Sequence, residues 1–463
     1  MSLTCPGRAG AAIIRTHNHR TSSSQLKNSG PQTPKAPQII PRAAHTVSRK
    51  EITSGALKVL YRLHKSGYQA FLVGGCVRDA LLDLHPKDFD VATDATPEEV
   101  RALFDNCRLI GRRFRLAHIR FGREVIEVAT FRAAAIHAAD DVEHDHEGRI
   151  IRDNVYGKIE EDVWRRDFTC NALYYNIADF SIWDYVNGVR DIERRRLVLI
   201  GDADNRLRED PVRMLRAVRF AAKLNFTIDE SLAAAIDNDV ELLANVPAAR
   251  LFDEFLKMFE TGFAEKTFDK LREYRLFAQL FPATDEELNK DPAFLRFVRA
   301  ALDNTDRRVA AGKSVTPMFL IGVFLWAPTE RLAALRRTEE RMSESQSLSL
   351  AAYELAAQQQ RRISIPRRFT VPMREMLALQ PRFMHTRGKR AMNLLAHRRF
   401  RAAYDFMLLR SKVGQFDADV AEFWTKVQKQ TAEQRVASFE IRASAKGKRR
   451  RRRSRRGKPA QTS

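Results

Sequence analysis

Residues 71–95 read FLVGGCVRDALLDLHPKDFDVATDA, and this stretch decides the fold of the chain. The aromatic and β-branched run over residues 68–73 predicts a strand that ends directly in Gly74 and Gly75, where backbone can approach a phosphate closely. The next residues, VRDALLDL, carry apolar side chains at helical spacing. The loop amides would therefore lie at a helix N-terminus, which favours anions, and Arg78 in the first turn is a candidate phosphate ligand.

Two aspartates follow the predicted helix. In an extended strand alternate side chains share a face, so we expect Asp88 and Asp90 to project together while Phe89 points into apolar packing. Such carboxylates suit Mg²⁺, and two ions about 3.5–4 Å apart would activate an attacking hydroxyl and hold a leaving pyrophosphate. A glycine pair or an Asp-x-Asp alone is weak evidence, but in this order the two together predict a nucleotidyltransferase site.

The charge of the chain points to nucleic acid as a partner. The 463 residues carry a formal net charge of +22, and much of the excess lies in acid-free ends at residues 1–50 and 446–463. Both ends lack sustained periodicity, so we expect them to be disordered. The basic tail is interpreted as a grip on an RNA backbone, with a solubilising tail or a localisation signal as alternatives, and the N-terminal fifty residues share the composition of a transit peptide.

Cysteine spacing and hydropathy bear on the compartment. Four cysteines lie far apart without paired spacing, which argues against disulfides and a zinc site and for a reducing, cytoplasmic location. The most apolar run, residues 318–327, is too short to span a bilayer and predicts a buried helix, so no membrane partner is expected.

Periodicity changes near residue 200. Before it, short strands alternate with short helices, and Thr96 and Pro97 mark a helix start; after it, helical periodicity continues to about residue 435. We therefore expect an α+β fold, with a small mixed-sheet head followed by an all-α body. The expected division is a disordered extension (1–50), a catalytic head (51–200), a helical nucleotide- and RNA-binding neck (201–285), a helical RNA-binding body (286–440) and a disordered Arg/Lys-rich tail (441–463).

A predicted hairpin supplies a third candidate carboxylate. LAHIRF and REVIEVATF flank Gly122, and Glu127 stands in a strand that is apolar on both faces. A charge there is costly unless it is compensated, so Glu127 forms either a buried ion pair with an arginine or a further metal ligand beside Asp88 and Asp90. We favour the metal ligand, because perturbed carboxylates gather at active sites.

Two further segments carry polar residues in patterns. RRDFTCNAL begins at Arg165, and on a helix Asp167 and Asn171 would share a face, either as a capped helix start or, with Arg166, as the lining of a triphosphate and ribose pocket. The run HAADDVEHDHE, residues 137–147, is rich in acids and histidines but lacks a supporting pattern. We interpret it as a solvated loop rather than a metal site.

A helix is predicted to begin at EDPVRMLR, residues 209–216. Pro211 at the first helical position would make Asp210 the N-cap, and arginines then recur at every third residue along a face expected to be exposed. An alternative is that Asp210 and Arg213 hydrogen-bond the edge of a base.

These motifs together resemble a known family. LVGGCVRD…PKDFDVATDA, RRDFTCNALYY and EDPVRMLRAVRFAAKL look like successive motifs of the class II branch of the polymerase β superfamily, which contains bacterial poly(A) polymerases and CCA-adding tRNA nucleotidyltransferases. The resemblance covers roughly residues 68–280. The segment LIGRRFRLAHIRFGREVIEVATFR and the basic tail resemble the poly(A) polymerase version.

The resemblance implies roles for individual residues. Asp88 and Asp90 match the metal-binding aspartates, Asp167 matches the aspartate of the RRD motif, and Asp210 with Arg213 matches the pair that contacts the incoming base in CCA-adding relatives. The resulting candidates are Asp88, Asp90 and Asp167 for catalysis; Gly74, Gly75, Arg78, Arg166, Asn171, Asp210 and Arg213 for the nucleotide; and Asp88, Asp90 and Glu127 for Mg²⁺.

The activity that the resemblance implies is template-independent addition of AMP from ATP to RNA 3′ ends, a step in RNA processing and decay. Two alternatives remain at this stage. One is a CCA-adding tRNA nucleotidyltransferase. The other is a nonenzymatic RNA-binding adaptor on a decayed transferase fold, against which the intact Asp88, Asp90 and Asp167 argue.

Overall fold

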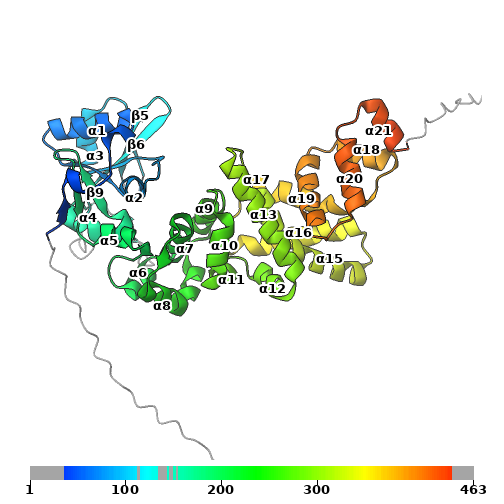
Figure 1. Ribbon diagram of the computed structural model, residues 1–463. Helices are drawn as coiled ribbons and strands as arrows, with labels where there is room; N and C mark the ends of the chain where they lie inside the picture. Colours follow the sequence, from blue (N-terminus) through cyan, green and yellow to red (C-terminus); the bar gives the residue numbers. More distant parts are fainter. Residues whose placement is uncertain (1–35, 112–114, 134–142, 145–149, 153–154, 441–463) are drawn as a thin grey trace, which may run out of the picture. The chain divides into compact units, whose positions relative to one another are not determined.

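The computed structural model describes residues 36–111, 115–133, 143–144, 150–152 and 155–440 (Figure 1). Its first part is built on an eight-stranded sheet with the order β1-β10-β9-β2-β3-β6-β5-β4. The strands are β1 (Gln38–Ile40), β2 (Ala70–Val73), β3 (Asp90–Thr93), β4 (Cys107–Ile110), β5 (Leu116–Phe121), β6 (Glu124–Thr130), β9 (Leu173–Asn176) and β10 (Ile182–Asp184). Strands β3 and β6 pair in parallel and the other neighbours are antiparallel, so the mixed sheet is confirmed.

The predicted local elements around the glycines and the hairpin are present. Strand β2 ends at Val73, and helix α2 (Gly75–Leu81) follows at once. Helix α3 (Pro97–Leu103) begins with a capping box in which Thr96 and Glu99 bond each other's backbone amides. Strands β5 and β6 form the expected hairpin, with Gly122 at a φ of +63° in its turn.

The two faces of the sheet are buried in separate cores because side chains alternate along each strand. Leu72 of β2 packs in a core that includes apolar residues of α1 (Ser54–Lys65). Phe71 and Val73 point to the other face and pack with Ile159 and Val163 of α4 (Ile159–Arg165). The remaining short elements of this part are η1 (Arg42–Ala44), η2 (Arg49–Glu51), β7 (Glu143–His144), β8 (Ile150–Arg152), η4 (Thr169–Asn171), α5 (Gly188–Glu193) and β11 (Arg196–Leu197).

The expectation of disorder over residues 1–50 is wrong for residues 36–50. Strand β1 closes one edge of the sheet by pairing Gln38–Ile40 with β10, and η1 and η2 follow before α1. A three-residue edge strand with Ile39 half exposed gives no periodic pattern, so the sequence carried no sign of it. Residues 1–35 and the basic tail from residue 441 lie outside the described ranges.

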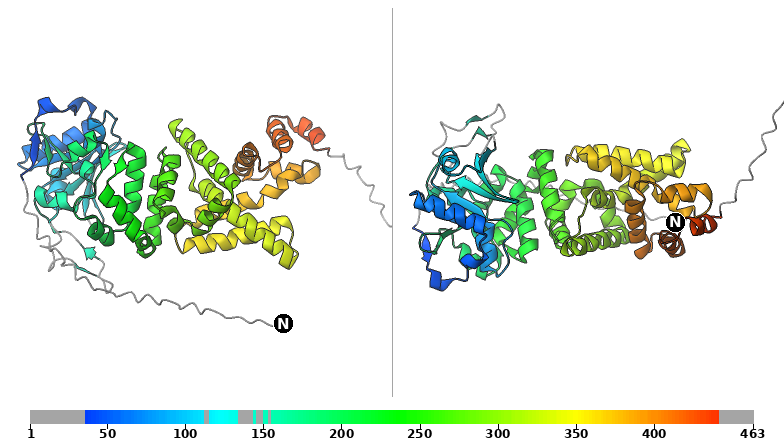
Figure 2. Two further views of the ribbon diagram at one scale, coloured as in Figure 1. Left: turned by 60° about the horizontal axis from the view of Figure 1, so that its bottom comes forward. Right: turned by 90° about the horizontal axis from the view of Figure 1, so that it is seen from above.

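Beyond β11 the described chain is helical apart from the short strand β12 (Thr227–Ile228), as expected and as Figure 2 shows from two further directions. The helices are α6 (Ala203–Glu209), α7 (Val212–Leu224), α8 (Glu230–Asp239), η5 (Val240–Asn245), α9 (Ala248–Phe259), α10 (Ala264–Glu273), α11 (Leu276–Leu280), α12 (Pro282–Lys290), α13 (Pro292–Ala310), α14 (Pro317–Phe324), α15 (Trp326–Glu340), α16 (Glu344–Gln360), α17 (Arg367–Ala378), η6 (Gln380–Met384), α18 (Gly388–Leu395), α19 (Phe400–Lys412), α20 (Ala418–Val427) and α21 (Ala432–Ser438).

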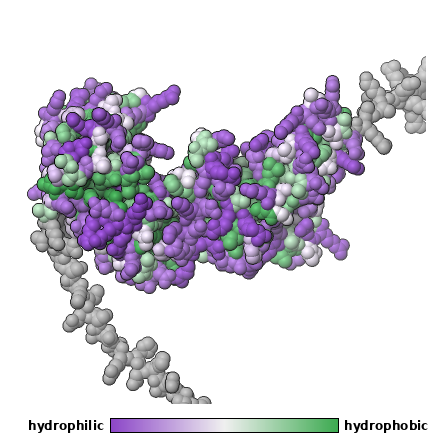
Figure 3. Space-filling model, viewed as in Figure 1, coloured by the Kyte–Doolittle hydropathy of each residue, from purple (hydrophilic) through white to green (hydrophobic). Residues whose placement is uncertain are grey.

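The apolar run at residues 318–327 forms most of α14, whose residues 320–324 are buried as predicted. Within the described residues no single helix is long and apolar enough to cross a membrane; α14 and α15 reach that length only as a pair bent by 55°. On the face shown in Figure 3, hydrophilic side chains cover most of the helical part, as expected when the apolar stripes of helices pack inward.

Candidate active site

The two aspartates of the DFD motif do not stand in one strand, contrary to the expectation. Strand β3 begins at Asp90, whose cross-strand partner is Val73, the last residue of β2. Because β2 ends there in the glycine turn, Asp88 has no partner strand and lies two residues before β3. Phe89 between them is 5% exposed and packs in the core, as predicted. The two carboxylates therefore come from a strand and from the loop that leads into it. Asp88 is exposed and does not line the cavity that Asp90 lines, although its charge contributes to the raised pKa of Asp90.

Parallel pairing of β3 and β6 places Glu127 directly opposite Asp90. Since Val91, Ile126 and Val128 point into the core on one face, Asp90 and Glu127 share the other face. The alternative of a buried ion pair with an arginine does not fit, because the Glu127 side chain is 50% exposed and its Oε1 lies 3.5 Å from His118 Nε2. Two carboxylates from distant parts of the sequence thus stand side by side.

These carboxylates line a cavity of about 250 Å³. Asp90 is exposed to solvent at the start of β3, and its pKa is raised to about 6 by desolvation from the surrounding protein and by the nearby Glu127 carboxylate, while Arg166 opposes the shift. Because each carboxylate raises the cost of ionising the other, a bound cation would stabilise the ionised pair. The cavity is lined by Val73, Asp90, Val91, Leu116, Glu127, Ala129, Arg132, Asp162, Arg165 and Arg166.

No group of three His, Cys, Asp or Glu side chains in the described part of the chain is placed to hold a metal ion. This does not conflict with a magnesium site, since Mg²⁺ usually takes one or two carboxylates and completes its shell with water and substrate phosphates. The segment 137–147, interpreted above as a loop, lies outside the described residues except for the backbone of 143–144.

Arg166 connects the carboxylates to the glycine loop. Its guanidinium donates to Asp162 Oδ2 from Nη2 at 2.9 Å and to the Tyr174 hydroxyl from Nε at 2.8 Å. A side-chain carbon at Gly74 would lie 4.0 Å from its Nη1. Asp162 and Tyr174 escaped the sequence analysis, although Asp162 stands four residues before Arg166, a spacing that brings side chains together on a helix.

The glycine loop follows β2 directly, as predicted. Gly74 has a φ of +81°, a conformation that favours glycine, and Gly75 begins α2. Arg78, expected as a phosphate ligand, is 2% exposed and engaged by protein partners: its Nη2 lies 2.5 Å from Asp79 Oδ1 and its Nη1 donates to Asn171 Oδ1. In this structure Arg78 lies beneath the loop and ties it to η4.

Asp167 and Asn171 do not share a helical face. Helix α4 ends at Arg165, and the extended backbone of Arg166, with a ψ of 164°, separates it from η4. Asn171 therefore contacts Arg78, whereas Asp167 turns to α7. The Asp167 side chain is 10% exposed and pairs with Arg213 Nε at 3.1 Å and with Arg216 Nη1 at 2.5 Å. It does not line the cavity beside Asp90.

The start of α7 also differs from the expectation. Helix α7 begins at Val212 with Pro211 as its N-cap, and Asp210 is the C-cap of α6. The Asp210 carboxylate lies 3.0 Å from Arg250 rather than beside the Arg213 guanidinium. The predicted helix start is therefore one position too early, although Asp210 Oδ1 accepts a hydrogen bond from the backbone amide of Val212 at 3.4 Å, as an N-cap side chain would.

The arginines of α7 do not form an exposed face. Arg213 is buried, Arg216 is partly buried, and Arg219 Nε lies 3.3 Å from the buried carboxylate of Glu254 on α9. Arg206 of α6 was not a candidate from the sequence, because no motif spacing points to it. Its guanidinium donates to the backbone oxygens of Arg165 and Arg166 at 3.2 and 2.7 Å. Helices α6 and α7 thus hold the chain segment that carries Arg166.

Three family models match the chain. They are described as the poly A polymerase head domain over residues 70–198, the probable RNA and SrmB-binding site of polymerase A over 225–288, and the polymerase A arginine-rich C-terminus over 340–458. The first covers the sheet with its carboxylates except for the edge strand β1, and the other two cover helical segments.

Whole-chain relatives agree with these matches. Poly(A) polymerase I of Salmonella typhi is 46% identical over 84% of this chain and 85% of its own, and that of Escherichia coli O6:H1 is 47% identical over 81% and 82%. A CCA-adding enzyme of Bacillus pumilus is 35% identical over only 54% of this chain and 60% of its own.

Among solved structures, the Bacillus stearothermophilus CCA-adding enzyme in complex with CTP has a TM-score of 0.51 and is 25% identical over 83% of this chain and 82% of that one. The Thermotoga maritima CCA-adding enzyme complexed with tRNA_CCA, at 18% identity, shares the fold with a TM-score of 0.54 and covers 86% of this chain and 87% of that one. The fold, the paired carboxylates and the extent of the sequence identity lead to one conclusion: the chain belongs to the bacterial poly(A) polymerase family of nucleotidyltransferases.

Proposed function

We propose that the cavity beside Asp90 is where this protein transfers AMP from ATP to RNA 3′ ends. Polyadenylation is the activity of its relatives: the Poly(A) polymerase I proteins are 42–47% identical over 81–86% of the chain. The observation that carries the location is the parallel register that sets Asp90 opposite Glu127, in a cavity that Arg166 also lines.

The donor set fits Mg²⁺. Asp88, Asp90 and Glu127 offer hard carboxylate oxygens, which Mg²⁺ prefers. Desolvation and the Glu127 carboxylate raise the pKa of Asp90, and a bound cation would stabilise its ionised form and lower that pKa again. We propose Asp88 and Asp90 as ligands of a two-ion site with Glu127 beside them. Bound ions would supply stabilisation of the charge that develops on the phosphates during transfer.

The surrounding residues bind and orient the nucleotide. Arg166, fixed by Asp162 and Tyr174, is placed to bind the triphosphate, and Gly74 lets phosphate oxygens approach the backbone amides of the loop. Arg78 and Asn171 hold that loop from below. Positioning of this kind supplies much of the rate enhancement in transfer reactions.

For the residues at the helical junction we propose supporting roles. Asp167 and Arg213 fix the segment that carries Arg166, so they act on the reaction through its position. Asp210 is less buried and lies at the junction of α6 and α7, and it is the residue of this pair that we propose to contact the base.

The site is tested by replacing Asp90. Asp90→Asn keeps the shape of the side chain and removes its charge, so pyrophosphate release from ATP with an RNA oligonucleotide is expected to fall by about a thousandfold, a size typical of lost charge stabilisation. Asp83→Asn is the matched control, because Asp83 is an exposed residue with a φ of +57° that asparagine tolerates. Near-normal turnover of Asp90→Asn would exclude this cavity as the site of transfer.

Nucleotide choice separates the family branches. We expect ATP to be incorporated repeatedly on a generic RNA, and CTP to be a poor substrate. Addition of CTP to a tRNA that lacks its 3′ end, followed by a stop, would instead indicate a CCA-adding enzyme; the CCA-adding enzymes of Bacillus pumilus and Lactobacillus gasseri match about half of this chain.

We also propose a division of labour along the chain, with transfer in residues 51–200, nucleotide and RNA contacts in 201–285, and RNA binding in 286–440. The tail at 441–463 would bind the RNA backbone, and its deletion should lower the salt dependence of RNA affinity by about 0.7 per lost phosphate contact. An unchanged slope would reject this role.

The described cysteines are unpaired, which supports the reducing, cytoplasmic location that we propose.

A further inference from the structure

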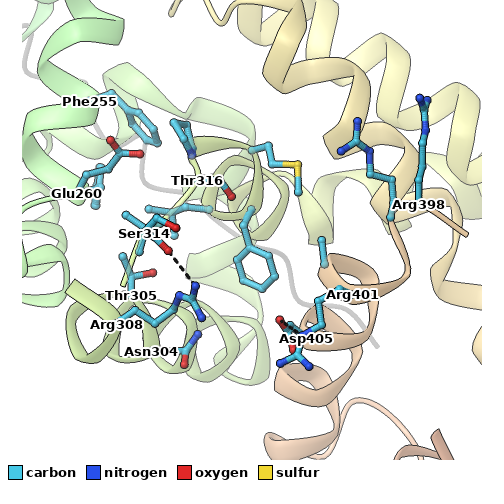
Figure 4. Close-up of a pocket in the computed structure, with 18 residues that line it drawn as sticks. Phe255, Glu260, Asn304, Thr305, Arg308, Ser314, Thr316, Arg398, Arg401 and Asp405 are labelled. Carbon is cyan, nitrogen blue, oxygen red and sulfur yellow. Dashed lines mark hydrogen bonds and ion pairs between the residues drawn. The ribbon is translucent and has the colours of Figure 1, made fainter. Parts of the chain in front are cut away.

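A second cavity lies in the helical part, lined by α9, α13, α14, α19 and the segments that flank them (Figure 4). It has a volume of about 330 Å³, within the range of small-molecule sites, and shares no lining residue with the cavity beside Asp90. None of the candidate residues described above belongs to it.

One wall of this cavity is apolar. Met318 and Phe319 of α14 are partly buried there, and Phe255, Phe259 and Leu320 form the buried layer that they join. Figure 4 shows Phe255 on the side of the cavity across from Arg398 and Arg401. Flat apolar surfaces of this kind accept the face of a nucleobase.

Four arginines line the cavity, Arg308 from α13 and Arg398, Arg399 and Arg401 from the facing side, together with two carboxylates, Glu260 and Asp405. Arg398 and Arg399 pair with Glu375, and Arg401 pairs with Asp405. Arg308 differs from these three. Its Nη2 donates to the backbone oxygen of Ser314 at 2.9 Å, and no carboxylate of the described chain lies within ion-pair distance of it.

Glu260 contributes an acceptor that lacks a donor. Its Oε1 is buried and has no hydrogen-bond partner among the residues that the structure describes, although the side chain lines the cavity. A buried acceptor left unpaired costs stability, and a donor on a ligand would restore the missing bond.

From this combination we propose that the cavity binds one adenine nucleotide of single-stranded RNA, with the base against Met318 and Phe319 and a phosphate beside Arg308. The exocyclic amine of adenine is a donor that Glu260 can accept from, whereas uracil has a carbonyl oxygen, O4, in the place of that amine. The inference rests on the proposed function in one respect: the adenylate tract is the product of transfer, so the growing tail itself is the ligand.

The test compares two neighbouring arginines of α13. Binding of oligo(A) is measured by fluorescence anisotropy in EDTA without ATP, so that no transfer occurs. Arg308→Ala should weaken binding about fourfold at about 0.15 M salt and lower the salt slope by about 0.7, as expected for one lost phosphate contact. Arg307→Ala is the matched control, because Arg307 is exposed, pairs with Asp303 and does not line the cavity.

Two further variants address the base. Glu260→Gln should narrow the preference for oligo(A) over oligo(U), and Ala402→Trp should weaken oligo(A) binding by filling the cavity. Addition of a single AMP at saturating RNA should be unchanged in all of these variants, since none touches the cavity beside Asp90. Thermal unfolding of each variant checks that it is folded.

Several results would overturn the proposal. If the Arg308→Ala and Arg307→Ala variants bound oligo(A) with equal affinity, or if Ala402→Trp bound it normally, the cavity would not be a binding site for RNA. A loss of ATP binding in Arg308→Ala with unchanged oligo(A) binding would assign it to the free nucleotide. Because the binding assay contains no ATP, its failure is distinct from a failure of the transfer assay on Asp90→Asn.

Discussion

Asp90 and Asp167 both belong to motifs that indicate a catalytic role, yet their surroundings are opposite. Asp90 faces another carboxylate, and desolvation together with Glu127 raises its pKa to about 6. Asp167 is buried between Arg213 and Arg216, which neutralise it. A motif in the sequence identifies a carboxylate, but its neighbours in the fold decide whether that carboxylate is free to bind a ligand. Asp90 is free to bind a cation, whereas Asp167 is already paired with the guanidinium groups of Arg213 and Arg216.

The largest effect on stability is expected at Asp167. Asp167→Asn removes the buried carboxylate that pairs with Arg213, which keeps only the more exposed Glu209 as a charge partner, so the free energy of unfolding should fall by about 3 kcal/mol, at the low end for a broken buried pair. Denaturant unfolding followed by circular dichroism measures it. Asp303→Asn, which removes an exposed partner of Arg307, is the control and should cost about 0.5 kcal/mol. Equal losses would contradict the assignment of Asp167 to the junction.

A smaller effect, on ion binding, is expected at Glu127. Glu127→Gln removes one negative charge beside Asp90 and keeps the shape of the side chain, so the Mg²⁺ concentration that gives half-maximal transfer should rise by about tenfold. The measurement is a magnesium titration of single-AMP addition. Glu124→Gln, at the start of the same strand, provides the control. An unchanged magnesium requirement would remove Glu127 from the proposed site.

Arg216 tests the other side of the comparison. It is more exposed than Arg213 and shares Asp167 with it, so Arg216→Gln should lower the free energy of unfolding by only about 1 kcal/mol. Its combination with Asp167→Asn should cost less than the sum of the two single changes. Strict additivity would show that Arg216 does not interact with Asp167.

The smallest effect, and of opposite sign, is expected for the stability of Asp90→Asn. A carboxyl whose pKa is raised on folding binds its proton more tightly in the folded state, so its ionisation reduces stability as pH rises from its ordinary range through about 6. Asparagine removes that cost. At pH 8 without divalent metal, the Tm should be equal to or slightly above that of the unchanged protein, and a clear decrease would refute the contrast with Asp167.

Local patterns predicted most of the sheet and the helices. The strand before Gly74, the helix start at Thr96 and the hairpin around Gly122 depend on neighbours in sequence, and each appears where it was expected. Glu127 stood out as a carboxylate in a strand expected to be apolar on both faces, and the structure has its side chain on the exposed face of β6. Three-residue β1 escaped, because an edge strand that short is fixed by its partner β10 rather than by its own pattern.

The parts of the site that the sequence missed depend on contacts between distant segments. No spacing relates Arg206 to the backbone oxygens of Arg165 and Arg166, or Arg216 to Asp167. The α7 arginines read as a solvated face because their carboxylate partners lie on other elements. For the same reason Arg78, which looked like a surface ligand, is enclosed between Asp79 and Asn171.

The side-chain pattern of β6 also disfavours pairing with β3 in the wrong register. If β6 slipped by one residue, Glu127 would turn into the apolar core and Ile126 would face water, so the mistaken alignment would bury a charge and lose an apolar contact at once. Glu127, which we propose to take part in the reaction, thereby raises the free energy of the nearest wrong register. When β3 and β6 pair, the favoured register is the one that sets Glu127 opposite Asp90.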